Sequence, residues 1–96
     1  MKIPSKIKLG AHTFKVIQRA GLETDDNFGK ASLDKCEVFI RSDLPQSVQE
    51  ETLLHEVFHV LRQLNHLEKE SDKEEERETQ ILARAMYQFL CDNKLF

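Results

Sequence analysis

The sequence predicts a small α+β domain in which an antiparallel sheet of three to four strands packs against two helices. Apolar and polar residues alternate within residues 2–9, 12–18 and 36–41, which is typical of half-buried strands. After Pro45 the apolar residues instead recur every three or four positions, which is the helical period. Because 96 residues bury one modest core, we expect residues 1–96 to form a single domain.

The predicted strands fall into two hairpins. The first joins residues 2–9 to residues 12–18, and the second joins residues 28–33 to residues 36–41. Within the third of these strands, Gly29 predicts a bulge or a place where another part of the chain approaches closely.

The first helix is predicted to run from Pro45 to about Asn65 and to be buried on more than one side. Leu53 and Val60 widen its apolar stripe. The stripe itself consists of apolar residues that we expect to face the core: Val48, Leu54, Val57, Phe58, Leu61 and Leu64.

A charged connector separates this helix from a second one, which is predicted to run from Ser71 or Asp72 to about Asn93. Its apolar side chains lie on one face, which predicts the side that packs. They are Ile81, Leu82, Ala85, Met86, Phe89 and Leu90.

The sequence H-E-x-x-H at positions 55–59 lies in the middle of the first predicted helix. Residues four apart lie one above the other on a helix, so His55 and His59 can point both imidazoles at one ion. Glu56 lies about 100° further around the axis, from where it reaches a water without taking a coordination position. This pattern predicts a zinc site with Glu56 as the general base.

A catalytic zinc ion usually has a third protein ligand. His66 is about 10.5 Å further along the helix than His59, which is too far for it to share the ion. A carboxylate near the start of the last helix is the natural alternative. The residues alone leave four of them open: Glu74, Glu75, Glu76 and Glu78.

Two stretches, EETLLHEVFH at 50–59 and ERETQILA at 76–83, together with the strand hairpin before them, resemble small gluzincin-type zinc metallopeptidases. They are most similar to the ImmA/IrrE-like peptidases of phages and mobile elements. The resemblance implies a minimal zincin-like fold and makes Glu76 the third zinc ligand. The chain departs from the family's E-x-x-A-N-x-F-A pattern at Thr79, Gln80 and Leu82.

The period of the last helix favours other glutamates. The centre of its apolar face falls nearer to Glu75 and Glu78. Glu76 instead shares its side with Thr79, Ala83 and Tyr87, whose small members would let the two helices approach closely. The resemblance and this close approach keep Glu76 as the first choice for the third zinc ligand, with Glu75 and Glu78 as alternatives.

The sequence thus predicts a zinc-dependent endopeptidase with a protein or peptide substrate. We expect the substrate to lie along the edge of the strand at 36–41. By residue type alone, Tyr87 and His66 are candidates for a second electrophile. The alternatives are a proteolytically silent zinc-binding domain that acts through a partner such as a repressor, and a metal-free interaction module.

Composition limits the classes of binding partner and the cellular compartment that the sequence predicts. The net charge of −3 and the absence of a basic patch argue against nucleic acid. No apolar run is long enough to span a membrane, and the N-terminus lacks the apolar segment of a signal peptide. Cys36 and Cys91 are far apart and form no C-x-x-C motif, which predicts reduced thiols and a cytoplasmic protein.

Overall fold

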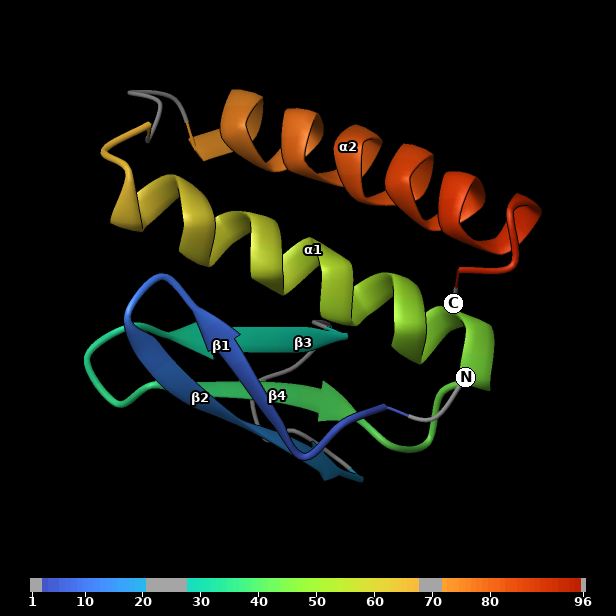
Figure 1. Ribbon diagram of the computed structural model, residues 1–96, viewed down its shortest axis with the longest axis horizontal. Coiled ribbons are helices and arrows are strands. Elements are labelled where there is room, and N and C mark those ends of the chain that lie inside the picture. The colour runs from blue at the N-terminus through green and yellow to red at the C-terminus, as the bar shows by residue number, and fades with distance from the viewer. Residues whose placement is uncertain (1–2, 21–27, 68–71, 96) are drawn as a thin grey trace.

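The computed structural model describes residues 3–20, 28–67 and 72–95, and it confirms the predicted α+β class. The elements form three layers (Figure 1). A four-stranded sheet is the first layer, helix α1 (Gln46–Leu64) lies across it, and helix α2 (Asp72–Asp92) lies on the side of α1 away from the sheet. In the described part of the chain, α2 makes its contacts with other elements through α1 alone.

The sheet has the strand order β1-β2-β4-β3. Strands β1 (Lys6–Leu9) and β2 (His12–Arg19) form one antiparallel hairpin, and β3 (Gly29–Ser32) and β4 (Glu37–Arg41) form the other. The two hairpins join through β2 and β4, which run parallel. The sheet is therefore mixed, and the prediction of an antiparallel sheet is wrong at this pair.

The placement of β4 has a physical reason. Val38 and Ile40 are fully buried on β4, so this strand gains most from an interior position beneath α1. Strand β3, with the sequence GKAS, has no large apolar side chain and takes the edge. Apolar alternation specifies which face of a sheet each residue occupies, but not which strand is its neighbour.

The core lies between the sheet and α1. Phe14, Val38 and Ile40 of the sheet are fully buried, and they belong to one cluster with Leu53 and Val60 of α1. These two α1 residues, expected only to widen the apolar stripe, are the most buried apolar residues of the helix. Residues of the predicted stripe pack around this cluster as partly buried side chains: Val57, Leu61 and Leu64.

The prediction that the apolar face of α2 is its packing face is wrong. Its large side chains are 40–56% exposed: Ile81, Leu82, Met86 and Phe89. Helix α2 instead packs on α1 through Thr79 and Ala83, both fully buried. Small side chains at a helix contact allow a close approach, and polar side chains at its margins then reach across the interface.

Neither helix combines the length and apolar character of a membrane-spanning segment within the described residues. Polar links between α1 and α2 include a hydrogen bond of 2.7 Å from the Tyr87 hydroxyl to Glu50 Oε1 and one of 3.0 Å from Arg62 Nη2 to Glu78 Oε1.

Thr79 gives a test of this helix contact. Its hydroxyl oxygen is buried without a hydrogen-bond partner among the described residues. An unsatisfied buried polar group costs about 1–3 kcal/mol, so Thr79→Val is expected to stabilise the protein by about 1 kcal/mol or more. Urea unfolding measures this gain, and the slope of the unfolding free energy against urea concentration should be the same in both proteins. Thr79→Ser keeps the hydroxyl and loses the methyl group, and it should not stabilise; a stabilisation equal to that of valine would contradict the explanation.

Candidate metal centre and cleft

His55 and His59 lie on consecutive turns of α1 and face the same side, as their four-residue spacing predicts. Their Nε2 atoms are 3.1 Å apart, and the rings meet edge to face with centroids 4.8 Å apart. Both rings are half-buried. Helix α1 is continuous before His55 and after His59, so the two side chains converge without a bend in the backbone.

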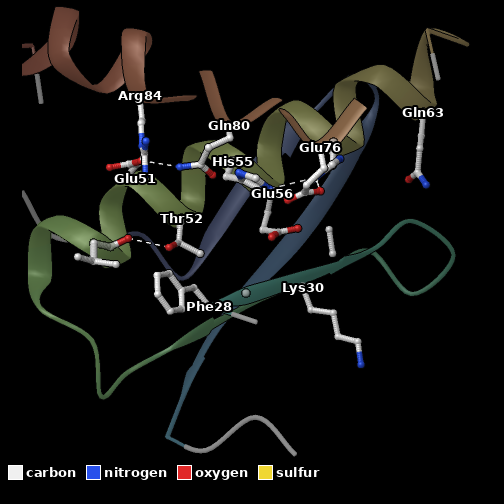
Figure 2. A pocket seen from close by; sticks show the side chains of 14 residues that line it. Phe28, Lys30, Glu51, Thr52, His55, Glu56, Gln63, Glu76, Gln80 and Arg84 are labelled. Atoms are coloured by element: carbon white, nitrogen blue, oxygen red, sulfur yellow. Dashed lines mark hydrogen bonds and ion pairs between the residues drawn. The ribbon is translucent and has the colours of Figure 1, made fainter. Parts of the chain in front are cut away.

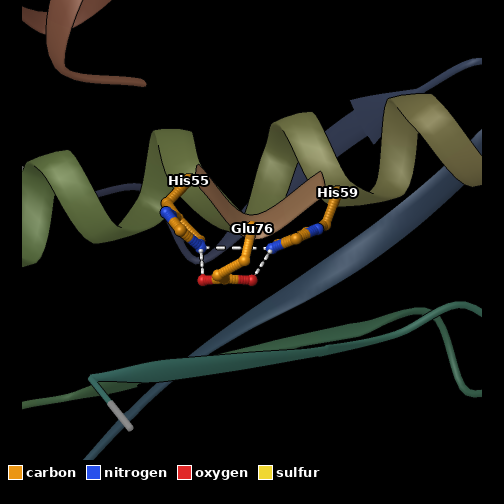
Figure 3. Close-up of side chains that lie close together, drawn as sticks. All are labelled: His55, His59 and Glu76. Carbon is orange, nitrogen blue, oxygen red and sulfur yellow. Dashed lines mark hydrogen bonds and ion pairs between the residues drawn. The ribbon is translucent and has the colours of Figure 1, made fainter. Parts of the chain in front are cut away.

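Glu76 completes the cluster from α2 (Figure 3). Its Oε1 atom is 2.7 Å from His55 Nε2, and its Oε2 atom is 2.9 Å from His59 Nε2. Glu76 is on the first turns of α2, on the side that packs against α1 through Thr79 and Ala83. The close approach of the helices therefore brings this carboxylate to the two imidazoles.

Glu75 and Glu78, the two named alternatives to Glu76, lie elsewhere. Glu75 Oε1 is 3.5 Å from Nδ1 of His59, on the opposite side of the ring from the cluster. Glu78 binds Arg62. A carboxylate beside the second nitrogen of a metal-binding histidine typically orients the ring, and the position of Glu75 suits that role.

The donor set fits a zinc ion. If both histidines donate a hydrogen to Glu76, the two N–H groups face each other at 3.1 Å, and the ring nitrogens repel. A cation between the three side chains removes this conflict because each then offers a lone pair. Tetrahedral zinc bonds of about 2.0–2.2 Å separate ligand atoms by about 3.3–3.6 Å. The ligand atoms of the three side chains are 2.7–3.1 Å apart, so each pair would have to separate by less than about 1 Å to hold the ion.

Glu56 is buried beside this cluster, between α1 and β3. Only 8% of its surface is exposed. Burial raises the pKa of its carboxyl to about 8, and the charge of Glu76 adds to the rise. A carboxylate with a pKa near neutrality both accepts and returns protons readily, as a general base must.

The cluster opens into a cleft of about 490 Å³ (Figure 2). Strand β3 and Phe28 form one side of it, and the two helices form the rest. Both helices contribute residues spaced four apart along one side. They are Glu51, His55, His59 and Gln63 on α1, and Glu76, Gln80 and Arg84 on α2.

The sequence prediction missed several of these cleft residues. Glu51 accepts hydrogen bonds of 3.0 Å from Gln80 Nε2 and 2.9 Å from Arg84 Nε, which join the helices at one end of the cleft. Their spacing in the sequence could have identified these residues. Glu51 precedes His55 by four residues and so lies on the same face of the helix. Gln80 and Arg84 follow Glu76 by four and eight.

The expected substrate-binding edge is also corrected. Strand β4 is paired on both sides, so residues 36–41 offer no free edge. The edge strand beside the cleft is β3, whose residues Gly29, Lys30 and Ala31 line it.

Neither residue named as a second electrophile lines the cleft. The Tyr87 hydroxyl binds Glu50, and this hydrogen bond is the main reason why the pKa of Tyr87 is raised. His66 follows the end of α1 and is exposed. Lys30 and Gln63 are cleft residues that can donate hydrogen bonds.

Gly29 is the point of close approach that the sequence predicts. A Cβ atom there would lie 2.7 Å from Cγ2 of Thr52 and 2.8 Å from the carbonyl oxygen of Phe39. Gly29→Ala is therefore expected to push β3 away from α1 and to destabilise the fold by about 1–3 kcal/mol, measured by urea unfolding.

Thr52→Ser provides a matched background for this change. It removes Cγ2 but keeps the hydroxyl, which donates a 2.7 Å hydrogen bond to the Val48 carbonyl. In this background Gly29→Ala should cost less, because the contact with Thr52 Cγ2 is gone and only those with the Phe39 carbonyl and, at 3.4 Å, with Glu56 Cγ remain of the three. Equal costs in the two backgrounds would show that the contact with Thr52 does not limit the approach of β3.

Comparison of the chain with protein-family models, with curated proteins and with solved structures found no match. The assignment of a function therefore depends on the residues and the geometry described above.

Proposed function

We propose that this chain is a cytoplasmic zinc metallopeptidase of the gluzincin type, similar to the ImmA/IrrE-like peptidases. One observation carries the proposal: two imidazoles from α1 and a carboxylate from α2 converge beside a buried glutamate, in a cleft that an edge strand borders. His55, His59 and Glu76 would hold the ion, and Glu56 would act as the general base.

A zinc ion held there would polarise a peptide carbonyl and lower the pKa of a bound water. Glu56 takes a proton from the attacking water and returns it to the leaving amine. Burial of Glu56 supports this assignment, because it raises the pKa of the carboxyl and so favours uptake of a proton from the water. Its burial beside β3 also keeps bulk water from the proton that it holds.

The edge of β3 supports a peptide as the substrate. An edge strand presents backbone N–H and C=O groups that an extended peptide can pair with. Because residues 29–31 line the cleft, a peptide paired there passes the three converging side chains. At one end of the cleft it meets Phe28, which is half exposed, and at the other it meets Gln63 (Figure 2).

The test combines metal content with cleavage. Purified protein loaded with zinc and dialysed should retain one ion per chain by elemental analysis. It should cut peptides in a mixed-sequence library analysed by mass spectrometry. A chain that retains zinc but cuts neither peptides nor unfolded proteins would instead be a silent zinc-binding domain. A chain that retains no zinc would be a metal-free interaction module.

A further inference from the structure

The face of the sheet away from α1 is strongly basic. Both helices lie on the other side of the sheet, and no described helix or strand covers this outer face (Figure 1). The four strands together hold six basic residues and one acidic residue, a net charge of +5. The two helices hold four basic and nine acidic residues, a net charge of −5. The fold therefore separates charges that the net charge of the chain averages away.

The register of the strands places all six basic residues on the outer face. Val16, Val38 and Ile40 are buried towards α1, so the residues that alternate with them point the other way. The basic residues of all four strands occupy such outward positions: Lys6, Lys8, Lys15, Arg19, Lys30 and Arg41. In the sequence they are spread over residues 6–41 and form no basic run, so it is the fold that gathers them.

Most of these cations have no acidic partner among the described residues. Arg41 is the exception, since it is bonded to Asp43 at 2.8 Å. Glu37 is the one acidic residue of the outer face, and it is the register neighbour of Lys15 without forming an ion pair with it. Four lysines of the face are exposed and form no ion pair with a described residue: Lys6, Lys8, Lys15 and Lys30.

An apolar and aromatic centre lies among these cations. Ile17 and Phe39 are register partners on the two middle strands, and both are half-buried. The Arg19 guanidinium lies over the Phe39 ring, 5.2 Å from its centroid. Lys30 is the partner of Phe39 on β3, and its side chain points away from the helices (Figure 2). Aromatic rings and guanidinium planes are the surfaces on which unpaired bases stack in protein complexes.

This combination selects single-stranded nucleic acid among the anionic partners. An acidic peptide or an anionic membrane would use the lysines alone. A single strand has phosphates for the lysines and bases for the Arg19–Phe39 stack. A duplex keeps its bases stacked on one another, so it offers mainly phosphates to a flat face. Four strands make a face roughly 14 Å wide, which suits a segment of a few nucleotides.

We propose that the outer face of the sheet binds single-stranded nucleic acid, with phosphates on the exposed lysines and a base stacked on Arg19 and Phe39. This partner differs from the expectation based on composition, because the net charge of the chain averages over the two sides of the fold. The outer face and the cleft lie on opposite sides of the sheet. Binding there does not require the proposed peptidase activity, and metal-free protein with a chelator present serves for the test.

Fluorescence anisotropy of labelled oligonucleotides measures the affinity. Oligo(U) and oligo(dT) of about 12 nucleotides distinguish RNA from DNA, and a duplex of the same length is the third probe. At least one single strand should bind about 10-fold more tightly than the duplex. If four lysines contact phosphates, this affinity should fall about 50-fold between 50 mM and 200 mM salt. A duplex that binds as tightly, or no binding of either single strand at 50 mM salt, would overturn the proposal.

Variants separate stacking from charge. Phe39→Leu keeps an apolar side chain without the ring, and Arg19→Gln removes the guanidinium from an exposed position. Each should weaken single-strand binding about 5-fold or more, as expected for the loss of a stacked base. Lys15→Gln should reduce the slope of log affinity against log salt by about 0.7. Lys73→Gln removes an exposed lysine of α2 and is the matched control, which should change neither quantity.

Two results with these variants would contradict the proposed surface. One is unchanged single-strand binding by both Phe39→Leu and Arg19→Gln. The other is an equal loss of affinity in Lys73→Gln and Lys15→Gln, since binding would then follow the total charge of the chain rather than the outer face. Arg19 is exposed, so its variant keeps the stacking test valid if Phe39→Leu does not fold.

Discussion

Replacing His55 or His59 with alanine, or Glu76 with glutamine, is expected to weaken zinc binding by more than 100-fold. Loss of a residue that only orients a ligand already costs about 10–100-fold, and loss of a ligand costs more. In the unsubstituted protein, zinc at 100 times its Kd should stabilise the fold by about 2.7 kcal/mol, which raises Tm by roughly 10–20 °C for a domain of this size. Chelator competition measures the Kd, and thermal unfolding with and without zinc measures the stabilisation.

The controls distinguish the three glutamates. His12→Ala removes an exposed histidine of β2 outside the cluster and should change neither measurement. Glu78→Gln breaks the pair with Arg62 and should leave the zinc Kd unchanged. Glu75→Gln should weaken binding by about 10-fold, because its carboxylate lies beside the second nitrogen of His59. If Glu75→Gln or Glu78→Gln abolished binding and Glu76→Gln did not, the choice of Glu76 would be wrong.

The convergence of the cluster was partly visible in the sequence. Helical spacing alone predicts that His55 and His59 face one way, because the contact is local. The choice of Glu76 required the register of α2 against α1. Thr79 and Ala83 are small residues on the same side of α2 as Glu76, and they indicated that register. The period of the large apolar residues instead favoured Glu75 or Glu78 as the third ligand. The small residues were the better guide, since they mark where two backbones approach.

The two errors in the prediction of the fold have related causes. The apolar period of α2 predicts a buried face, but burial against α1 requires close contact. The large apolar side chains on the outer side of α2 remain outside that contact. Likewise, the alternation in residues 36–41 identifies β4 as a strand but not its position. That position depends on long-range pairing with β2, for which the local sequence holds no signal.

Glu56→Gln is expected to lower kcat/KM for peptide hydrolysis by about 10²–10⁴-fold while the zinc Kd changes little. Glutamine has nearly the same shape and cannot take a proton from water. Rates with a peptide from the library, together with zinc titration of the same preparation, measure the two effects separately. Glu78→Gln, outside the cleft, is the matched control and should retain activity. Activity that survives Glu56→Gln would remove Glu56 from the mechanism.

Glu56→Gln, which should lower the activity, should raise the stability of the metal-free protein. Burial raises the pKa of Glu56 from its usual 4.5 to about 8, so the folded state holds a proton that the unfolded chain releases. The free energy of unfolding therefore falls as the pH rises from about 5 to 8, by up to about 1.4 kcal/mol per pH unit from this group. Glu56→Gln has no such proton and should be the more stable form at pH 8. Urea unfolding with a chelator present measures this difference, and equal pH dependence in both proteins would mean that Glu56 ionises in the fold as freely as in water. A gain in stability with a loss of activity is what a buried general base predicts, because burial that tunes the carboxyl for proton transfer also makes its charge costly.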